Sequence, residues 1–379
     1  MNEPHERETG SAPSGPPVGR GDVARHLLRP HLLRDSLALA RQPSLRNSML
    51  AGLQAALTAA IALPLIHLSP WPHLIGFAAL GTLAALFGRF APERRRSNIV
   101  LLCALLQTGT VFSMSAAAWL GLPVWALLML LALGCGVLFF LSVSGRFGPP
   151  GALIFVFAAG AAMSAAPAFS AVIERTIATA AAAALAWLVC AATEYFRHKA
   201  TPNGPFVVEA VNPLADRLMA ALRISIGAAG AIFVSHALGA NHPAWAAMGS
   251  LAVMQGEHLH IRMHRALQRM AGTVIGALLA WLILMLDPSV WTIIAVLFGL
   301  QTATEMIIGS NYGLGQILVT PMALLMTYLA NPGADMAMVP ERVIDTLLGA
   351  AIGISAAVLF STVRDRQDLA DRLASRARD

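Results

Sequence analysis

Twelve apolar runs follow one another along this chain, and most of them have the length that crosses a bilayer. A membrane-spanning helix needs about 20 apolar residues, because it rises 1.5 Å per residue through a hydrocarbon core about 30 Å thick. The runs therefore predict an all-α, polytopic membrane protein with about twelve transmembrane helices. We place the spans at residues 48–68, 72–90, 98–120, 123–143, 151–168, 171–195, 217–239, 243–261, 268–286, 289–309, 312–330 and 341–363.

Composition supports a chain that is dissolved in lipid. Apolar residues make up 57% of it and charged residues only 12%, whereas a soluble domain carries about 25% charged residues. The net charge of +6 does not indicate a nucleic-acid partner, because 25 of the 26 basic residues are arginines concentrated in the connections between apolar runs. The lipid bilayer is the expected surrounding. Cys103, Cys135 and Cys190 lie inside apolar runs and give no disulfide pattern.

The distribution of charge predicts the orientation. With the N-terminus in the cytoplasm, 24 of the 26 Lys and Arg residues fall on the cytoplasmic side. Only Arg175 and Arg342 then lie outside. Basic residues stay on the cytoplasmic side of a membrane, so we expect both termini to be cytoplasmic.

The sequence also repeats itself. Residues 78–86 resemble residues 246–254, residues 174–179 resemble 341–346, and residues 146–148 resemble 311–313, at offsets of 165 to 168. Each unit holds six spans, an even number, so the halves should be parallel and related by a pseudo-two-fold axis along the membrane normal. This gives a basic cytoplasmic tail (1–47), a first six-span repeat (48–196), a cytoplasmic linker (197–216), a second repeat (217–363) and a cytoplasmic tail (364–379).

Residues 241–276 carry the most polar detail. Trp245 opens an apolar segment, and a basic stretch that includes Arg262, Arg265 and Arg269 precedes the next apolar segment. We interpret this as a spanning helix, a basic cytoplasmic turn and a second spanning helix. The pairs Gly272/Gly276 and Gly349/Gly353 are spaced as GxxxG, which is typical of close helix packing in membranes.

The second half resembles the fusaric acid resistance protein-like (FUSC) family, which includes aromatic acid exporters. The resemblance rests on Trp245 at the start of a span, Arg269-Met-Ala-Gly272-Thr273 with Gly276, Tyr312 followed by Thr320-Pro321, and Arg342-Val-Ile-Asp345-Thr346 with Gly349. The first half resembles the same pattern more weakly. The resemblance implies an efflux protein of the bacterial inner membrane for hydrophobic or aromatic carboxylic acids. Long members of the family carry a large soluble region after each six-span block, and we expect this chain to be a short form without that region.

The sequence lacks the motifs that are typical of several other classes of membrane protein. There is no GxxxxGK[ST] loop and only one lysine, Lys199, which disfavours nucleotide-driven pumping. HExxH, a nucleophile elbow and paired Cys/His ligand sets are absent too, which disfavours a membrane enzyme. Glu257, His260 and His264 share a helical face and could hold a divalent cation, but the neighbouring arginines argue against it. We expect no metal and no cofactor. The functions that remain are transport driven by an ion gradient and passive conduction.

Ionisable residues within spans are candidates for proton coupling, because they are costly to insert into lipid. The candidates are Glu305, Glu257 and Asp345. Burial disfavours the ionised form of a carboxyl group, and an acid that titrates near neutrality can carry protons. Glu305 ranks first, since Gln301 and Thr304 share its helical face and would line a cavity with it.

Each candidate has a structural alternative. Glu305 could snorkel to water, and Asp345 could pair with Arg342 near the outer interface. Glu257 aligns with Arg89 between the repeats, so the two-fold could bring an acid and a base together near its axis. His236 lies near the outer surface and fits an interfacial histidine.

Arginines near the cytoplasmic mouth would attract a carboxylate, and aromatic or polar side chains would contact the rest of the substrate. Trp245 and Tyr312 could equally be interface anchors. The sequence thus predicts a twelve-span exporter of weak, aromatic organic acids in exchange for protons. A passive organic-anion channel and a scaffold that transports nothing remain alternatives, and a homo-oligomer or a periplasmic adaptor is left open. The candidate substrate-binding residues are Arg269, Arg262, Arg89, Trp245, Gln301, Tyr312 and Thr320.

Overall fold

The computed structural model describes residues 44–91, 93–197, 212–255, 259–330 and 336–361, and within these ranges the chain is helical with no strand. This confirms the all-α prediction. The predicted tails and linker fall almost wholly outside the described residues. The described helices are α3 (Leu45–His67), η1 (Pro72–Leu74), α4 (Ile75–Thr82), η2 (Leu83–Leu86), α5 (Glu93–Trp119), α6 (Val124–Ser144), α7 (Leu153–Ala162), α8 (Phe169–Ala192), η3 (Glu194–Phe196), α9 (Leu214–Ala237), α10 (Ala244–Met254), α11 (Leu259–Leu284), α12 (Val290–Ile308), α13 (Tyr312–Ala330) and α14 (Met338–Leu359).

Each of the twelve apolar runs contains one α-helix, but three of those helices are short. In the described part of the chain, nine helices are long and apolar enough to cross a membrane. The predicted spans 72–90, 151–168 and 243–261 contain only α4 with 8 residues, α7 with 10 and α10 with 11. The prediction of one full-length helix was wrong at 72–90 and 151–168, because apolar residues continue beyond the helix end as turn or 3₁₀ backbone. At 243–261, α10 ends at Met254, and residues 256–258 lie outside the described residues. Gly88, for example, follows η2 with a φ of 68°, which ends a helix.

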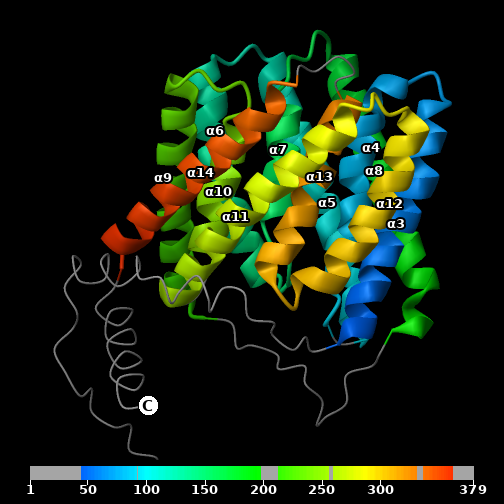
Figure 1. Ribbon diagram of the computed structural model, residues 1–379, viewed down its shortest axis with the longest axis horizontal. Coiled ribbons are helices and arrows are strands. Elements are labelled where there is room, and N and C mark those ends of the chain that lie inside the picture. The colour runs from blue at the N-terminus through cyan, green and yellow to red at the C-terminus, as the bar shows by residue number, and fades with distance from the viewer. Residues whose placement is uncertain (1–43, 92, 198–211, 256–258, 331–335, 362–379) are drawn as a thin grey trace, which may run out of the picture.

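The short helices lie inside the bundle. None of the residues of α4, α7 or α10 is exposed. Helix α7 contacts both of the other two and lies near the middle of the bundle in Figure 1. Chain that is not helical is tolerated at membrane depth only where protein surrounds it. The long helices provide that surround and turn apolar stripes outward. The stripe on α3 consists of Leu45, Met49, Leu53, Leu57, Ile61 and Leu65.

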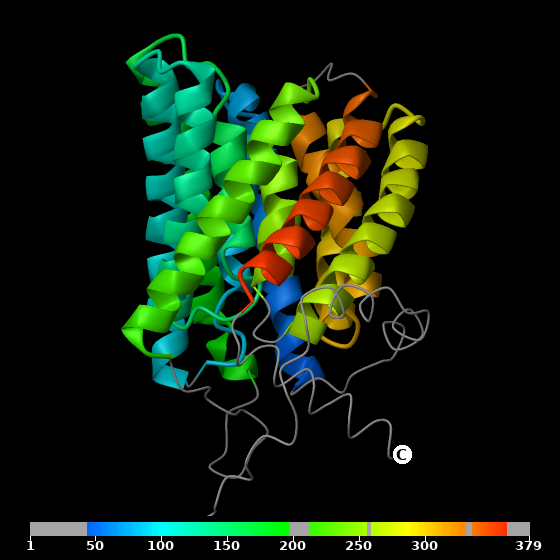
Figure 2. The same cartoon turned by 90° about the vertical axis from the view of Figure 1, so that its left-hand side faces the viewer.

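Helix contacts occur in reciprocal pairs, as expected of two parallel repeats. Helix α3 packs against α12, and its counterpart α9 packs against α6, the counterpart of α12. The pairs α4·α8 and α10·α14, and the pairs α5·α8 and α11·α14, correspond in the same way. The first helix of each repeat therefore packs against the fourth helix of the other, which interlocks the halves (Figures 1 and 2).

Two equivalent glycines show the correspondence at atomic scale. A Cβ on Gly81 of α4 would lie 2.4 Å from the carbonyl oxygen of Thr179 on α8, and a Cβ on Gly249 of α10 would lie 2.9 Å from that of Thr346 on α14. Both short helices therefore touch the backbone of the sixth helix of their own repeat.

The glycine pairs predicted to pack helices do so. Gly272 and Gly276 bring α11 against α13, where added Cβ atoms would lie 2.7 Å and 2.5 Å from carbonyl oxygens of Gly313 and Ile317. Gly349 and Gly353 bring α14 against α10 in the same way. These contacts fix the relative positions of α10, α11, α13 and α14, which carry side chains of the candidate site.

The basic segment before the ninth span is not a turn throughout. Helix α11 already begins at Leu259, so Arg265 and Arg269 lie on its first three turns. Arginine is a good helix former, so charge at the membrane surface does not end the helix. The N-terminal end of α3 and the C-terminal end of α14 both lie in the lower part of the bundle in Figure 1. That this end faces the cytoplasm stays a prediction.

Candidate functional site

Arg89 and Glu305 form a buried ion pair that joins the two repeats. Arg89 follows η2 in the first repeat, and Glu305 lies on α12 in the second. The backbone carbonyl of Arg89 also accepts a hydrogen bond from the Asn47 amide of α3 at 3.3 Å. Glycine makes room for the pair, because a Cβ on Gly52 of α3 would lie 2.9 Å from Cβ of Glu305. Glu305 therefore does not snorkel to water.

Two polar neighbours on α12 share the buried face of Glu305. Gln301 and Thr304 are buried, as the shared helical face predicted. Within the described part of the chain, Gln301 Nε2 and Thr304 Oγ1 have no hydrogen-bond partner. Unpaired buried donors are costly, so this face is equipped to hold a polar ligand or water. The acid that meets Arg89 is Glu305, whereas Glu257 lies outside the described residues.

A second polar centre lies wholly within the second repeat, and we call it the arginine cluster: Arg269, Arg342, Asp345, Tyr312 and Gln316. Arg269 of α11 is 2% exposed, and its Nη1 donates to the Tyr312 hydroxyl at 3.1 Å and to Gln316 Oε1 at 3.4 Å. Gln316 Nε2 in turn donates to Thr320 Oγ1 at 3.3 Å. Among the predicted substrate candidates, Tyr312 thus binds Arg269 directly, and Thr320 is linked to Arg269 through Gln316.

Arg342 of α14 is the most deeply buried member of the cluster. It is 0% exposed, and its guanidinium carbon lies 5.2 Å from the centre of the Trp245 ring. Trp245 is also stacked on His242 at 4.3 Å between ring centres, and His242 pairs with Glu341 at 3.0 Å. Trp245 is buried and contacts Arg342, which makes it a support for that side chain in this structure.

Asp345 does not form the ion pair with Arg342 that its spacing suggested. Its Oδ1 accepts a hydrogen bond from Ser235 of α9 at 2.7 Å, and its Oδ2 has no partner among the described residues. One turn of helix separates Arg342 and Asp345 in sequence, but Arg342 turns toward Trp245 and Asp345 toward α9. The two groups interact electrostatically without a hydrogen bond between them.

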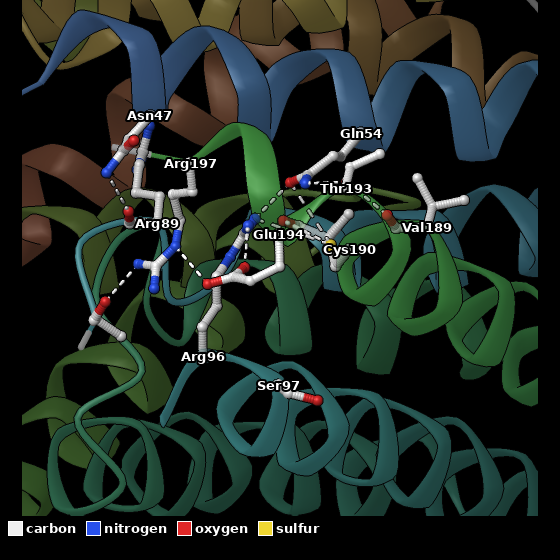
Figure 3. A network of polar contacts seen from close by, with 12 residues as sticks. Asn47, Gln54, Arg89, Arg96, Ser97, Val189, Cys190, Thr193, Glu194 and Arg197 are labelled. Atoms are coloured by element: carbon white, nitrogen blue, oxygen red, sulfur yellow. Dashed lines mark hydrogen bonds and ion pairs between the residues drawn. The ribbon is translucent and has the colours of Figure 1, made fainter. Parts of the chain in front are cut away.

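The first repeat holds a polar network whose members bind one another. Figure 3 shows Arg96 of α5 bound to Glu194 at 3.2 Å and to Gln54, while Gln54 donates to Thr193 at 2.6 Å. Arg197 binds Glu194 at 2.6 Å and the carbonyl of Ala91. These contacts tie α3, α5 and the end of α8 together. We interpret the network as scaffold.

Equivalent positions of the repeats differ in polarity. Phe87, Phe147 and Phe155 contact one another in the first repeat, with Phe87 and Phe155 stacked at 5.1 Å between ring centres. The offsets align them with Gln255, Tyr312 and Thr320 of the second repeat. Polar groups that could meet a substrate are thus gathered in the second repeat, as its sequence indicated.

Sequence reasoning missed Gln316, Ser235 and the burial of Arg342. Gln316 lies four residues before Thr320, so both share a face of α13, and this signal was available. Nothing in the sequence placed Ser235 of α9 beside Asp345. For Arg262 the structure describes the helix but not the side chain, and His236 is exposed at the end of α9.

Comparisons with known proteins show that part of the second repeat is similar to a described family. Residues 229–356 match the model of the fusaric acid resistance protein-like family. That segment holds every residue on which the sequence resemblance rested, so the resemblance is confirmed there. Together with the long apolar helices, the match supports a multi-pass membrane protein.

Two curated relatives match part of the chain. It is 35% identical over 152 residues to the uncharacterized membrane protein YvaC of Bacillus subtilis (strain 168), a match that covers 39% of this chain and 24% of that protein. It is 32% identical over 137 residues to the uncharacterized protein ORF2 of Neisseria gonorrhoeae, covering 36% of this chain and 32% of that protein. The matches thus span about a quarter to a third of the length of these relatives. No solved structure matches.

Proposed function

We propose that this chain exports hydrophobic or aromatic carboxylic acids across the bacterial inner membrane in exchange for protons. The family match supports transport. The observation that carries the proton coupling is the buried ion pair between Arg89 and Glu305. Among the ion pairs of the described residues, this one joins the two repeats. Its carboxylate, on Glu305, is the group that a proton can neutralise.

Protonation of Glu305 would change the contact between the repeats. While Glu305 is ionised, its charge compensates that of Arg89 and holds α12 to the segment after η2. Once Glu305 is neutral, Arg89 is a buried cation without its counter-charge, which is unfavourable in a low-dielectric interior. A movement of the repeats that exposes Arg89 to water, or the binding of an anion beside Arg89, would then lower the free energy. Proton binding and substrate movement are linked in this way through one pair of side chains.

The test measures uptake of radiolabelled benzoate into inside-out membrane vesicles with an acidic lumen. Export in the cell corresponds to uptake here. Weak acids accumulate by passive diffusion on the alkaline side, so benzoate concentrated in the acidic lumen requires coupled transport. Glu305→Gln should remove this accumulation while the protein remains inserted, because the substitution removes a charge from a span. Glu174→Gln is the control, since Glu174 is a partly exposed acid outside both polar centres.

Two results would count against the proposal. Gradient-driven accumulation by Glu305→Gln vesicles would show that another group carries the proton. Benzoate movement that only runs down its own gradient, in wild-type and variant alike, would favour the passive organic-anion channel, which the buried arginines would also serve.

A further inference from the structure

Two buried arginines of the second repeat have most of their hydrogen-bond donors unused. Arg342 is 0% exposed and Arg269 is 2% exposed. Within the described residues, Nε, Nη1 and Nη2 of Arg342 and Nε and Nη2 of Arg269 have no hydrogen-bond partner. A buried charge without partners is among the most costly features that a membrane protein can contain.

No described acid forms an ion pair with either of the two guanidinium groups. The partners of Arg269, Tyr312 and Gln316, are neutral side chains. Asp345 is close enough to attract Arg342 electrostatically, but its bonded oxygen is taken by Ser235. Arg269 and Arg342 are also close enough to repel each other. With Asp345 ionised, the cluster keeps one positive charge in excess.

The first repeat supplies an internal comparison. Arg175 is the counterpart of Arg342, and it lies 5.2 Å from the centre of the Phe77 ring, just as Arg342 lies 5.2 Å from that of Trp245. Arg175, however, donates to the carbonyl oxygens of Ser164 at 2.9 Å and Ala165 at 2.7 Å. At the same position of the fold, the first repeat satisfies its arginine with backbone carbonyl groups, whereas no described residue of the second repeat accepts a hydrogen bond from Arg342.

We propose that Arg269 and Arg342 bind the carboxylate of the transported acid, and that the cluster selects monoanions. A guanidinium group offers two parallel donors to a carboxylate, and the unused nitrogens are enough for both arginines to contribute. The excess of one positive charge fits one carboxylate, and a dianion would leave uncompensated negative charge beside Asp345. Trp245 and Tyr312 are positioning residues that hold Arg342 and Arg269. This inference names the substrate site of the exporter proposed above and rests on that function.

The experiment measures binding without transport. The full chain is purified in detergent, and its thermal unfolding is followed at constant ionic strength against benzoate, phthalate or the neutral analogue benzamide. Benzoate should raise the unfolding midpoint in a saturable way, as expected of a ligand that binds only the folded state. Benzamide should not, and phthalate should need about a tenfold higher concentration.

Variants separate the site from general effects of charge. Arg342→Gln and Arg269→Gln should each weaken the apparent benzoate affinity about tenfold or more. Without ligand, Arg342→Gln should unfold at the same temperature as wild-type or higher, because it removes an unpartnered buried charge. The control Arg175→Gln should unfold at a lower temperature, because two carbonyl groups lose their donor, and should keep its benzoate response. If Arg342→Gln does not yield folded protein, Arg342→Lys, which keeps the charge but not the paired donors, should show the same weakened binding.

Failure of this carboxylate site and failure of the proposed proton-coupled export give different experimental results. Unchanged benzoate affinity in Arg342→Gln (or Arg342→Lys) and in Arg269→Gln would overturn the site, as would a wild-type chain that does not respond to benzoate. Proton-coupled uptake could still be present in that case. Binding that depends on both arginines, in a chain whose vesicles show no coupled uptake, would support the site and reject the proton-driven exporter.

Discussion

Arg89 and Glu305 lie 216 positions apart in the sequence, and their buried side chains form an ion pair between the two repeats. Each is held from a different direction, since Asn47 binds the backbone of Arg89 while Gly52 allows α12 to approach α3 at Glu305. The pair therefore connects the segment after η2 to α12, the fourth helix of the other repeat, and α3 contacts both partners.

Removal of either partner alone should destabilise the protein more than removal of both. Arg89→Gln leaves a buried carboxylate unpaired, which costs about 3–5 kcal/mol. Adding Glu305→Gln to Arg89→Gln should recover part of that loss. Thermal and denaturant unfolding of the purified single and double variants would give the coupling free energy. Additive effects of the two substitutions would contradict a direct interaction.

Close packing of α10 on α14 predicts a sharp difference between two glycines. Gly249→Ala places a Cβ 2.9 Å from the Thr346 carbonyl oxygen, whereas a Cβ on Gly299 of α12 meets nothing within 4 Å. Gly249→Ala should therefore lower the free energy of unfolding by about 1–3 kcal/mol, and Gly299→Ala should be neutral or stabilising by up to about 1 kcal/mol. Unfolding in detergent measures both, and equal tolerance would disprove the tight contact.

The predicted orientation can be tested with cysteines at opposite ends of the bundle. Tyr195 after α8 is 87% exposed and Leu286 after α11 is 82% exposed. The native cysteines are buried and give a low background. In intact cells, a membrane-impermeant thiol reagent should label Leu286→Cys and spare Tyr195→Cys, and permeabilised cells should allow labelling of both. The reverse pattern would place the termini outside.

The apolar stripe of α3 predicts which leucines face lipid. Leu63 is 0% exposed and Leu57 is 41% exposed. Leu63→Ala should destabilise the protein by about 2–5 kcal/mol because it opens a cavity. At Leu57, lipid replaces the lost side chain, so Leu57→Ala should cost less than about 1 kcal/mol. Comparable losses at both sites, measured by thermal unfolding in detergent, would show that α3 packs on both faces.

Much of the fold was predictable, because span-length apolar runs and glycine pairs four residues apart are local properties of a sequence. All twelve helices and both GxxxG contacts were expected for that reason. The lengths of α4, α7 and α10 were not, since a turn such as that at Gly88 is also built from a largely apolar stretch. Hydropathy does not distinguish a buried helix from the buried turn that follows it.

Some residues of the candidate site were predictable, but their pairings were not. Glu305 and Gln301 were identified because polar groups are rare in spans, and the structure buries both. Their partners depend on how α12 packs on α3, which no local signal contains. Arg342 was assigned to the outer flank by the charge rule, and its burial results from contact with Trp245, 97 positions earlier.

The shielding of the short helices has a mechanical consequence. Lipids around the described bundle touch the long helices, and α4, α7 and α10 have no exposed residue. Because these helices do not set the thickness of the surrounding bilayer, they can shift or tilt without changing the match between protein and lipid. Rearrangement of the interior is then opposed only by protein–protein contacts such as those of Gly81 and Gly249, so its energy should not depend on the acyl-chain length of the host membrane.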